Sequence, residues 1–167
     1  LLKLDRKRGC VDFHIQGPNK KLPESIEELH QIGDQYWLFA LGRELDDAIL
    51  HLSFNEPELG TWVFHTEGNL SSVVDYEQFL INQSDDWLAR EIILFLKRVL
   101  KRIDLSARSL ISLIEPGSCF AGFLLELVLA SDRSYMLEGS FEDSEVPAPV
   151  IIPTSMNFGS LPMCNGL

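Results

Sequence analysis

The chain has 167 residues, of which 46% are hydrophobic, and a formal net charge of −11. This length and composition suit one domain that can fill a core. The acidic charge argues against DNA or RNA as a partner, because phosphate-backbone binding needs clustered Lys and Arg, and no apolar run reaches the ~18 residues of a membrane span.

The cysteines and the N-terminus indicate the compartment. Cys10, Cys119 and Cys164 are odd in number and widely spaced, which favours a reducing environment. The chain starts at Leu1, without an initiator Met or a signal-peptide pattern. We therefore expect a cytoplasmic piece of a longer protein. The histidines are scattered, and their spacing predicts no metal site.

The first half of the chain alternates predicted strands and helices. Residues 10–16 alternate apolar and polar side chains and predict a half-buried strand at a sheet edge. Residues 23–32 predict a short helix, and residues 41–54 predict a longer amphipathic one. Residues 61–65 predict a short strand, followed by a polar loop over residues 66–72. Ligands of open α/β sheets bind at such loops.

The clearest predicted helix spans residues 85–103, because one apolar stripe recurs along it at helical spacing. Ser84 is the expected N-cap. Basic residues near the end of this helix complement its macrodipole, so we interpret them as structural rather than as an anion site.

The rest of the chain continues the alternation. Residues 110–114 predict a strand covered by helices on both faces, and residues 120–130 predict a helix. Residues 133–137 predict another strand, residues 139–149 an acidic loop, and residues 150–152 a last short strand. Alternating strands and helices predict an α/β fold with a mainly parallel sheet.

One carboxylate in the second half of the chain stands out. Glu126 is the only charged side chain between Glu115 and Asp132, and it follows the glycine-containing turn 117–122. A lone carboxylate on an apolar helix is costly unless it is paired, protonated or used. Backbone N–H groups at the preceding turn can hold developing negative charge. Together these features suit acyl-thioester chemistry.

Structural interpretations of the same residues stay open. Glu126 can form an ion pair with Arg133 or Arg108, and the turn glycines can serve backbone geometry alone. Cys119 lies in the turn, but no His is near it in sequence, which disfavours a thiol nucleophile.

The strand, turn, helix and Glu126, with Asp132 six residues later, resemble the crotonase (enoyl-CoA hydratase/isomerase) superfamily. Within it, the chain resembles the second crotonase-like half of the benzoyl-CoA-dihydrodiol lyase (2,3-epoxybenzoyl-CoA dihydrolase) family, over roughly residues 33 to 163. The blocks that carry this resemblance are Gly42–Leu50, Gly60–Phe64, Thr66–Gly68, Arg102–Asp104, Arg108–Leu110, Leu113–Gly122, Ala130–Met136, Asn157–Gly159 and Leu161–Met163.

The resemblance implies a fold and a reaction. The fold would be the crotonase spiral of ββα units, with a mainly parallel sheet flanked by helices. Residues 1–167 would form a single partial domain, with its core at 33–163 and its C-terminus truncated. The reaction would be the hydrolytic ring opening of an epoxidised aromatic CoA thioester, with loss of formate, in aerobic benzoate degradation. The substrate's own CoA would be the only group required, with no cofactor or metal.

The resemblance also assigns site residues. Two backbone N–H groups would polarise the thioester carbonyl. One would lie around Ala121, Gly122 and Phe123, and the other near Gly68. Glu126 would be the general acid/base. His65 and Glu67 lie beyond the predicted strand 61–65, where crotonases shape the acyl pocket.

The chain departs from the crotonase pattern at the turn and near Asn157. Phe120 and Phe123 stand where glycines are common, and one extra residue separates Gly117 from Glu126. The second catalytic carboxylate is absent, since residues 154–156 are Thr-Ser-Met. A non-catalytic module for packing or oligomerisation is therefore the alternative. The two hypotheses differ in whether the space between Glu126 and the Gly68 loop is open, and under either we expect a homo-oligomer.

Overall fold

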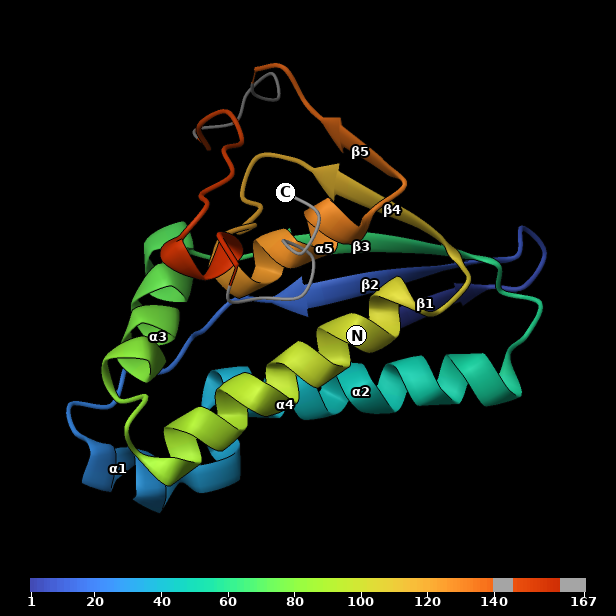
Figure 1. Cartoon of the computed structure of the whole chain (residues 1–167). Helices are drawn as coiled ribbons and strands as arrows, with labels where there is room; N and C mark the ends of the chain where they lie inside the picture. The colour runs from blue at the N-terminus through green and yellow to red at the C-terminus, as the bar shows by residue number, and fades with distance from the viewer. Residues whose placement is uncertain (140–145, 160–167) are drawn as a thin grey trace.

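The computed structural model describes residues 1–139 and 146–159, and it contains a five-stranded sheet in the order β1-β2-β3-β4-β5 (Figure 1). β1 pairs with β2 in antiparallel fashion, and the other neighbours are parallel. The predicted α/β fold with a mainly parallel sheet is confirmed. The strands are β1 (Leu2–Asp5), β2 (Cys10–Gln16), β3 (Thr61–Glu67), β4 (Ser109–Ile114) and β5 (Arg133–Met136).

The helices gather on one side of this sheet, as Figure 1 shows for α2, α4 and α5. Short 3₁₀ turns occupy Gly33–Gln35, Gly122–Leu124 and Ser155–Asn157. Within the described ranges, no helix is long and apolar enough to cross a membrane. The helices are α1 (Ile26–Ile32), α2 (Trp37–Asn55), α3 (Leu70–Asn82), α4 (Trp87–Asp104) and α5 (Leu125–Ala130).

The hydrophobic core lies between the helices and one face of the sheet. Phe13 on β2 is in register with Phe64 on β3, and both rings are buried. The predicted stripe of α4 is confirmed, since Ile92, Leu96 and Val99 are buried against the same core. Each such side chain stabilises the fold by about 1.5–3 kcal/mol through burial.

The opposite face of the sheet is not covered by helices in the part of the chain that the structure describes. On β4, Leu110 and Ile114 are buried, whereas Ile111 and Leu113 between them are only partly buried. On β5, Tyr135 is 53% exposed. The prediction that helices cover both faces of residues 110–114 is therefore wrong. A continuous apolar run predicts burial on both faces, but only every second side chain of β4 reaches the core.

Two predictions in the first half need correction. Residues 10–16 form β2, which is not an edge strand, because β1 pairs with its outer side. The predicted loop 66–72 is largely regular structure, since Thr66 and Glu67 end β3 and α3 begins at Leu70. The polar run is a helix cap, in which the side chain of Asn69 accepts a hydrogen bond from Ser72 N at 3.0 Å.

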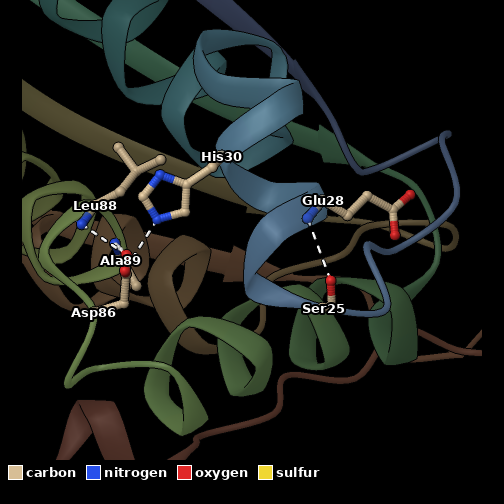
Figure 2. A network of polar contacts seen from close by, with 6 residues as sticks. All are labelled: Ser25, Glu28, His30, Asp86, Leu88 and Ala89. Atoms are coloured by element: carbon tan, nitrogen blue, oxygen red, sulfur yellow. Dashed lines mark hydrogen bonds and ion pairs between the residues drawn. The ribbon is translucent and has the colours of Figure 1, made fainter.

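The cap of α4 is Asp86 rather than Ser84. Its carboxylate accepts hydrogen bonds from Leu88 N at 2.8 Å and Ala89 N at 3.3 Å, as Figure 2 shows. The same carboxylate lies 3.0 Å from Nε2 of His30 on α1, and this contact lowers the pKa of Asp86. Ser84 is instead used in the turn after α3, where its N–H donates to Ile81 O.

The segment after β4 is less helical than predicted for residues 120–130. A 3₁₀ turn at Gly122–Leu124 leads into the six-residue α5. The predicted strand 150–152 is reduced to one parallel bridge between Ile152 and Ala121. Residues 140–145 of the predicted acidic loop 139–149 lie outside the described residues. The bridge holds residues 154–157 against the turn that precedes Glu126.

Candidate functional site

The turn after β4 is tied to the end of β3. Cys119 N donates to the hydroxyl of Thr66 at 2.9 Å, and Gly68 N donates to Gly117 O at 3.1 Å. A Cβ at Gly68 would lie 3.0 Å from Cα of Gly17, which follows β2. The ends of β2, β3 and β4 therefore meet at this turn. Position 68 must be glycine, because a Cβ there would press against the backbone of Gly17. This is the edge of a parallel sheet at which ligands usually bind.

Glu126 is fully buried at the start of α5. Nδ2 of Asn157 donates to its Oε1 at 2.6 Å and to Gly122 O at 3.0 Å. Of the two predicted ion-pair partners, Arg108 donates instead to Pro57 O at 2.7 Å, and Arg133 is exposed. Glu126 is thus held by an amide from a segment 31 residues away in sequence.

A second carboxylate, which sequence reasoning missed, meets the same turn. Glu77 on α3 is only 4% exposed and accepts a hydrogen bond from Phe123 N at 2.6 Å. It also accepts one from the hydroxyl of Thr154. A Cβ at Gly122 would overlap Oε2 of Glu77 and lie 2.6 Å from its Oε1, so only glycine leaves room for this carboxylate.

Burial raises the pKa of Glu77, and the nearby Glu126 carboxylate raises it further. The hydrogen bonds from Thr154 and Phe123 oppose the rise. A sequence signal for Glu77 existed, since it lies on the buried face of α3 with Val73, Tyr76 and Leu80. This signal does not identify Glu77 in the sequence analysis, because no helix is predicted there over residues 70–82.

Thr154 occupies the region where the second crotonase-like carboxylate was expected. Its hydroxyl contacts Glu77 and lies 3.4 Å from Oδ1 of Asn157. The site therefore holds two carboxylates, but the second one comes from α3 rather than from the segment before Asn157.

The backbone N–H groups predicted to polarise a carbonyl are engaged within the chain. Gly68 N donates to Gly117 O, and Gly122 N donates to Ile152 O at 3.0 Å. Phe123 N donates to the Glu77 carboxylate. Ala121 forms the parallel bridge with Ile152. A ligand oxygen would have to replace one of these internal acceptors.

His65 and Glu67 are not brought together with Glu126. They alternate with the buried Phe64 and Thr66 along β3 and lie on the open face of the sheet. The ring of His65 stacks on His14 at 4.7 Å, and its Nε2 lies 3.1 Å from Asp12. Glu67 accepts a hydrogen bond from Gln16 at 3.1 Å.

The space around the carboxylates is filled. Phe120 is fully buried and Phe123 is 2% exposed. A cavity lined by Glu77 and Phe123 measures about 10 Å³, which is room for one water at most. A larger cavity of about 470 Å³ lies between α2 and the β1–β2 edge, and none of the predicted site residues lines it. An acyl group could reach Glu126 only if the Phe side chains moved.

The remaining candidate groups fit structural roles. Burial raises the pKa of the Cys119 thiol to about 11, which disfavours the thiolate that a nucleophile needs. Among the described residues, no three His, Cys, Asp or Glu side chains gather in a way that could hold a metal ion. Cys164 lies outside the described residues.

Comparison with known proteins shows that the chain is similar in sequence to part of an enzyme. No protein-family model matches the chain. The chain is 43% identical over 164 residues to a benzoyl-CoA-dihydrodiol lyase from Aromatoleum evansii. The alignment covers 98% of this chain but only 29% of that enzyme, so the chain spans less than a third of the relative's length. The chain is thus homologous to one segment of a longer lyase.

Proposed function

We propose that this chain supplies one crotonase-like unit of a CoA-thioester lyase or hydrolase that opens the ring of an epoxidised benzoyl-CoA. Glu126 is its general acid/base. The observation that carries this proposal is the buried Glu126, which Asn157 holds beside the turn at Gly122. The similarity to a benzoyl-CoA-dihydrodiol lyase over nearly the whole chain supports the acyl-CoA substrate class.

The chemistry follows from the surroundings of Glu126. The Glu126 carboxyl group is fully buried, and a carboxyl group held in contact with a substrate can act as a general acid/base. The Asn157 amide fixes the direction in which its oxygens point. The N–H groups of Gly68 and Phe123 would bind the thioester oxygen once their internal acceptors withdrew.

Isothermal titration with benzoyl-CoA and with free CoA tests the proposal. We expect benzoyl-CoA to bind more tightly than free CoA. We expect Glu126→Gln to lower the affinity for benzoyl-CoA while leaving the affinity for free CoA unchanged. Glu115→Gln is the matched control, because Glu115 is exposed after β4. Equal affinity for the two ligands, or no binding at millimolar concentration, would contradict an acyl site in this chain.

A second candidate function is a non-catalytic packing module. The engaged N–H groups and the filled space beside Glu126 favour it. The open face of the sheet favours it too, since parallel sheets are normally covered on both faces. A module of this kind would cover that face with a second copy. We therefore expect a dimer or higher oligomer in light scattering after size-exclusion chromatography, and a monomer would count against this function.

A further inference from the structure

A second cavity lies away from the turn that holds Glu126. Figure 1 shows α2 beside β1 and β2, and a cavity of about 470 Å³ lies between this helix and the two strands. Small-molecule sites typically measure about 300–1,000 Å³. The buried side chains of Phe13, Ile15 and Leu45 contribute an apolar wall. The cavity therefore has the size and the apolar surface that the body of a small organic molecule needs.

One face of α2 lines this cavity, because the lining residues recur along the helix at spacings of three and four. Ala40 and Ala48 on this face have short side chains, which leave the space open. Glu44 and Asp47 lie between them in sequence, line the same cavity and are exposed. The sequence of α2 thus places two carboxylates at the solvent side of an apolar hollow.

These two carboxylates differ from their neighbour on the same helix. Asp46 forms an ion pair with Arg102 of α4. Among the residues that the structure describes, no ion pair involves Glu44 or Asp47. Side chains three residues apart on a helix are neighbours, and like charges there repel each other. A cation bound between Glu44 and Asp47 would relieve this repulsion.

Other ionisable groups of the lining are engaged with the chain. The amino group of Leu1 donates to His14 O at 3.0 Å. Burial lowers the pKa of the His14 imidazole, so this ring is neutral at pH 7. The ring of His51 is hydrogen-bonded to Asn55 at 3.2 Å. The two carboxylates therefore remain the groups of the lining that are open to a charged ligand.

We propose that this cavity binds a small organic amine, with its apolar body between α2 and β2 and its ammonium group at Glu44 and Asp47. Trp37 and Phe13 also belong to the lining, which favours an aromatic body. The same carboxylates repel phosphate groups, so a CoA ester is disfavoured here. This amine site is separate from the acyl site proposed at Glu126 and does not depend on it.

Isothermal titration with three ligands that share an indole body tests the charge preference. Tryptamine carries an ammonium group, tryptophol a hydroxyl and indole-3-propionate a carboxylate. We expect tryptamine to bind about tenfold more tightly than tryptophol, because each exposed ion pair contributes up to about fivefold. Indole-3-propionate should bind more weakly than either. Equal affinities for the three ligands, or no binding of tryptamine at millimolar concentration, would overturn the inference.

Variants of α2 test the position of the ligand. Glu44→Gln and Asp47→Asn should each lower the affinity for tryptamine by about two- to fivefold, while the affinity for tryptophol stays unchanged. Glu91→Gln is the matched control, because Glu91 is exposed on α4 and does not line the cavity. An affinity for tryptamine that neither carboxylate variant lowers would overturn the inference.

Ala48→Phe tests the cavity itself. The larger side chain would occupy the hollow, so binding of both tryptamine and tryptophol should be lost. Undiminished binding to this variant would place the ligands elsewhere and contradict the proposal. If Ala48→Phe does not fold, the two carboxylate variants still decide the question. Benzoyl-CoA is titrated separately, so failure of the amine site and failure of the acyl site are distinguishable.

Discussion

The contact between Gly122 and Glu77 makes a quantitative prediction for Gly122→Ala. Gly122 has a φ of +47°, a left-handed conformation that costs a non-glycine residue about 1–2 kcal/mol. The new Cβ would also overlap the Glu77 carboxylate, and overpacking of this kind costs about 1–3 kcal/mol. We expect Gly122→Ala to lower the free energy of unfolding by about 2–5 kcal/mol in the wild-type background.

Two comparisons separate these contributions. In a Glu77→Ala background the overlap disappears, so Gly122→Ala should cost only the backbone part, about 1–2 kcal/mol. Gly117→Ala is the matched control, since Gly117 in the same turn has a φ of +88° and nothing lies within 4 Å of its added Cβ. It should also cost about 1–2 kcal/mol.

Urea unfolding at 25 °C measures the free energy of unfolding of the wild type and of each variant, and the coupling between positions 77 and 122 follows from the double-mutant cycle. We expect a coupling of about 1–3 kcal/mol. If Gly122→Ala costs the same with and without Glu77, the carboxylate does not pack against this turn, and the two-carboxylate site is wrong.

Three further changes test the network and the caps. Asn157→Ala should lower the free energy of unfolding by about 2–3 kcal/mol in urea titrations, because Glu126 loses a charge-assisted hydrogen bond, whereas the exposed Asn82→Ala should have little effect. Asp86→Ala should lower the Tm more than Asp85→Ala, because Asp86 caps α4, and equal Tm values would refute the cap. The pKa of Asp86 is lowered in the folded state, so its stabilisation is present above the ordinary Asp pKa and is lost as pH falls through the lowered pKa. Glu77→Gln should gain stability relative to wild type as pH rises above about 4.3. The pKa of Glu77 is raised in the folded state, so this carboxyl group stabilises the wild-type fold at low pH, and that stabilisation is lost as pH rises through the folded-state pKa. A stability difference between the two proteins that stays constant with pH would contradict this prediction.

The sequence predicted those parts of the fold in which periodicity and burial agree. The stripe of Ile92, Leu96 and Val99 identified α4 because one face of that helix packs on the core. The alternation of residues 10–16 identified β2 for the same reason. Its neighbour β1 was missed, because a four-residue strand with mixed side chains carries little pattern.

The missed elements share a physical cause, which is that local polar residues were judged without their tertiary partners. Asn69 caps a helix, but in sequence the residues around it resemble a loop. Glu77 looks like an ordinary helix carboxylate until α3 is packed against the turn at Gly122. Its partner Thr154 is 77 residues away, a pairing that no sequence spacing reveals.

The predicted site was partly assembled by the structure. Glu126, Gly122 and Phe123 meet at one turn, and Gly68 is tied to the same turn through Gly117. His65 lies on the other face of the sheet, because strand alternation places it opposite Phe64. Whether the assembled residues bind a thioester stays a prediction.

The measurement that tests the site most directly is amide NMR of the ¹⁵N-labelled chain during titration with benzoyl-CoA. We predict shifts at the N–H groups of Gly68 and Phe123, because a bound thioester oxygen would displace their internal acceptors. We also predict a shift at the side-chain amide of Asn157, because its acceptor Glu126 would contact the ligand. Shifts confined to Leu41 and Ala48, which line the larger cavity beside α2, would place the ligand elsewhere. Shifts there, or no shifts at all, would contradict a working acyl site at Glu126.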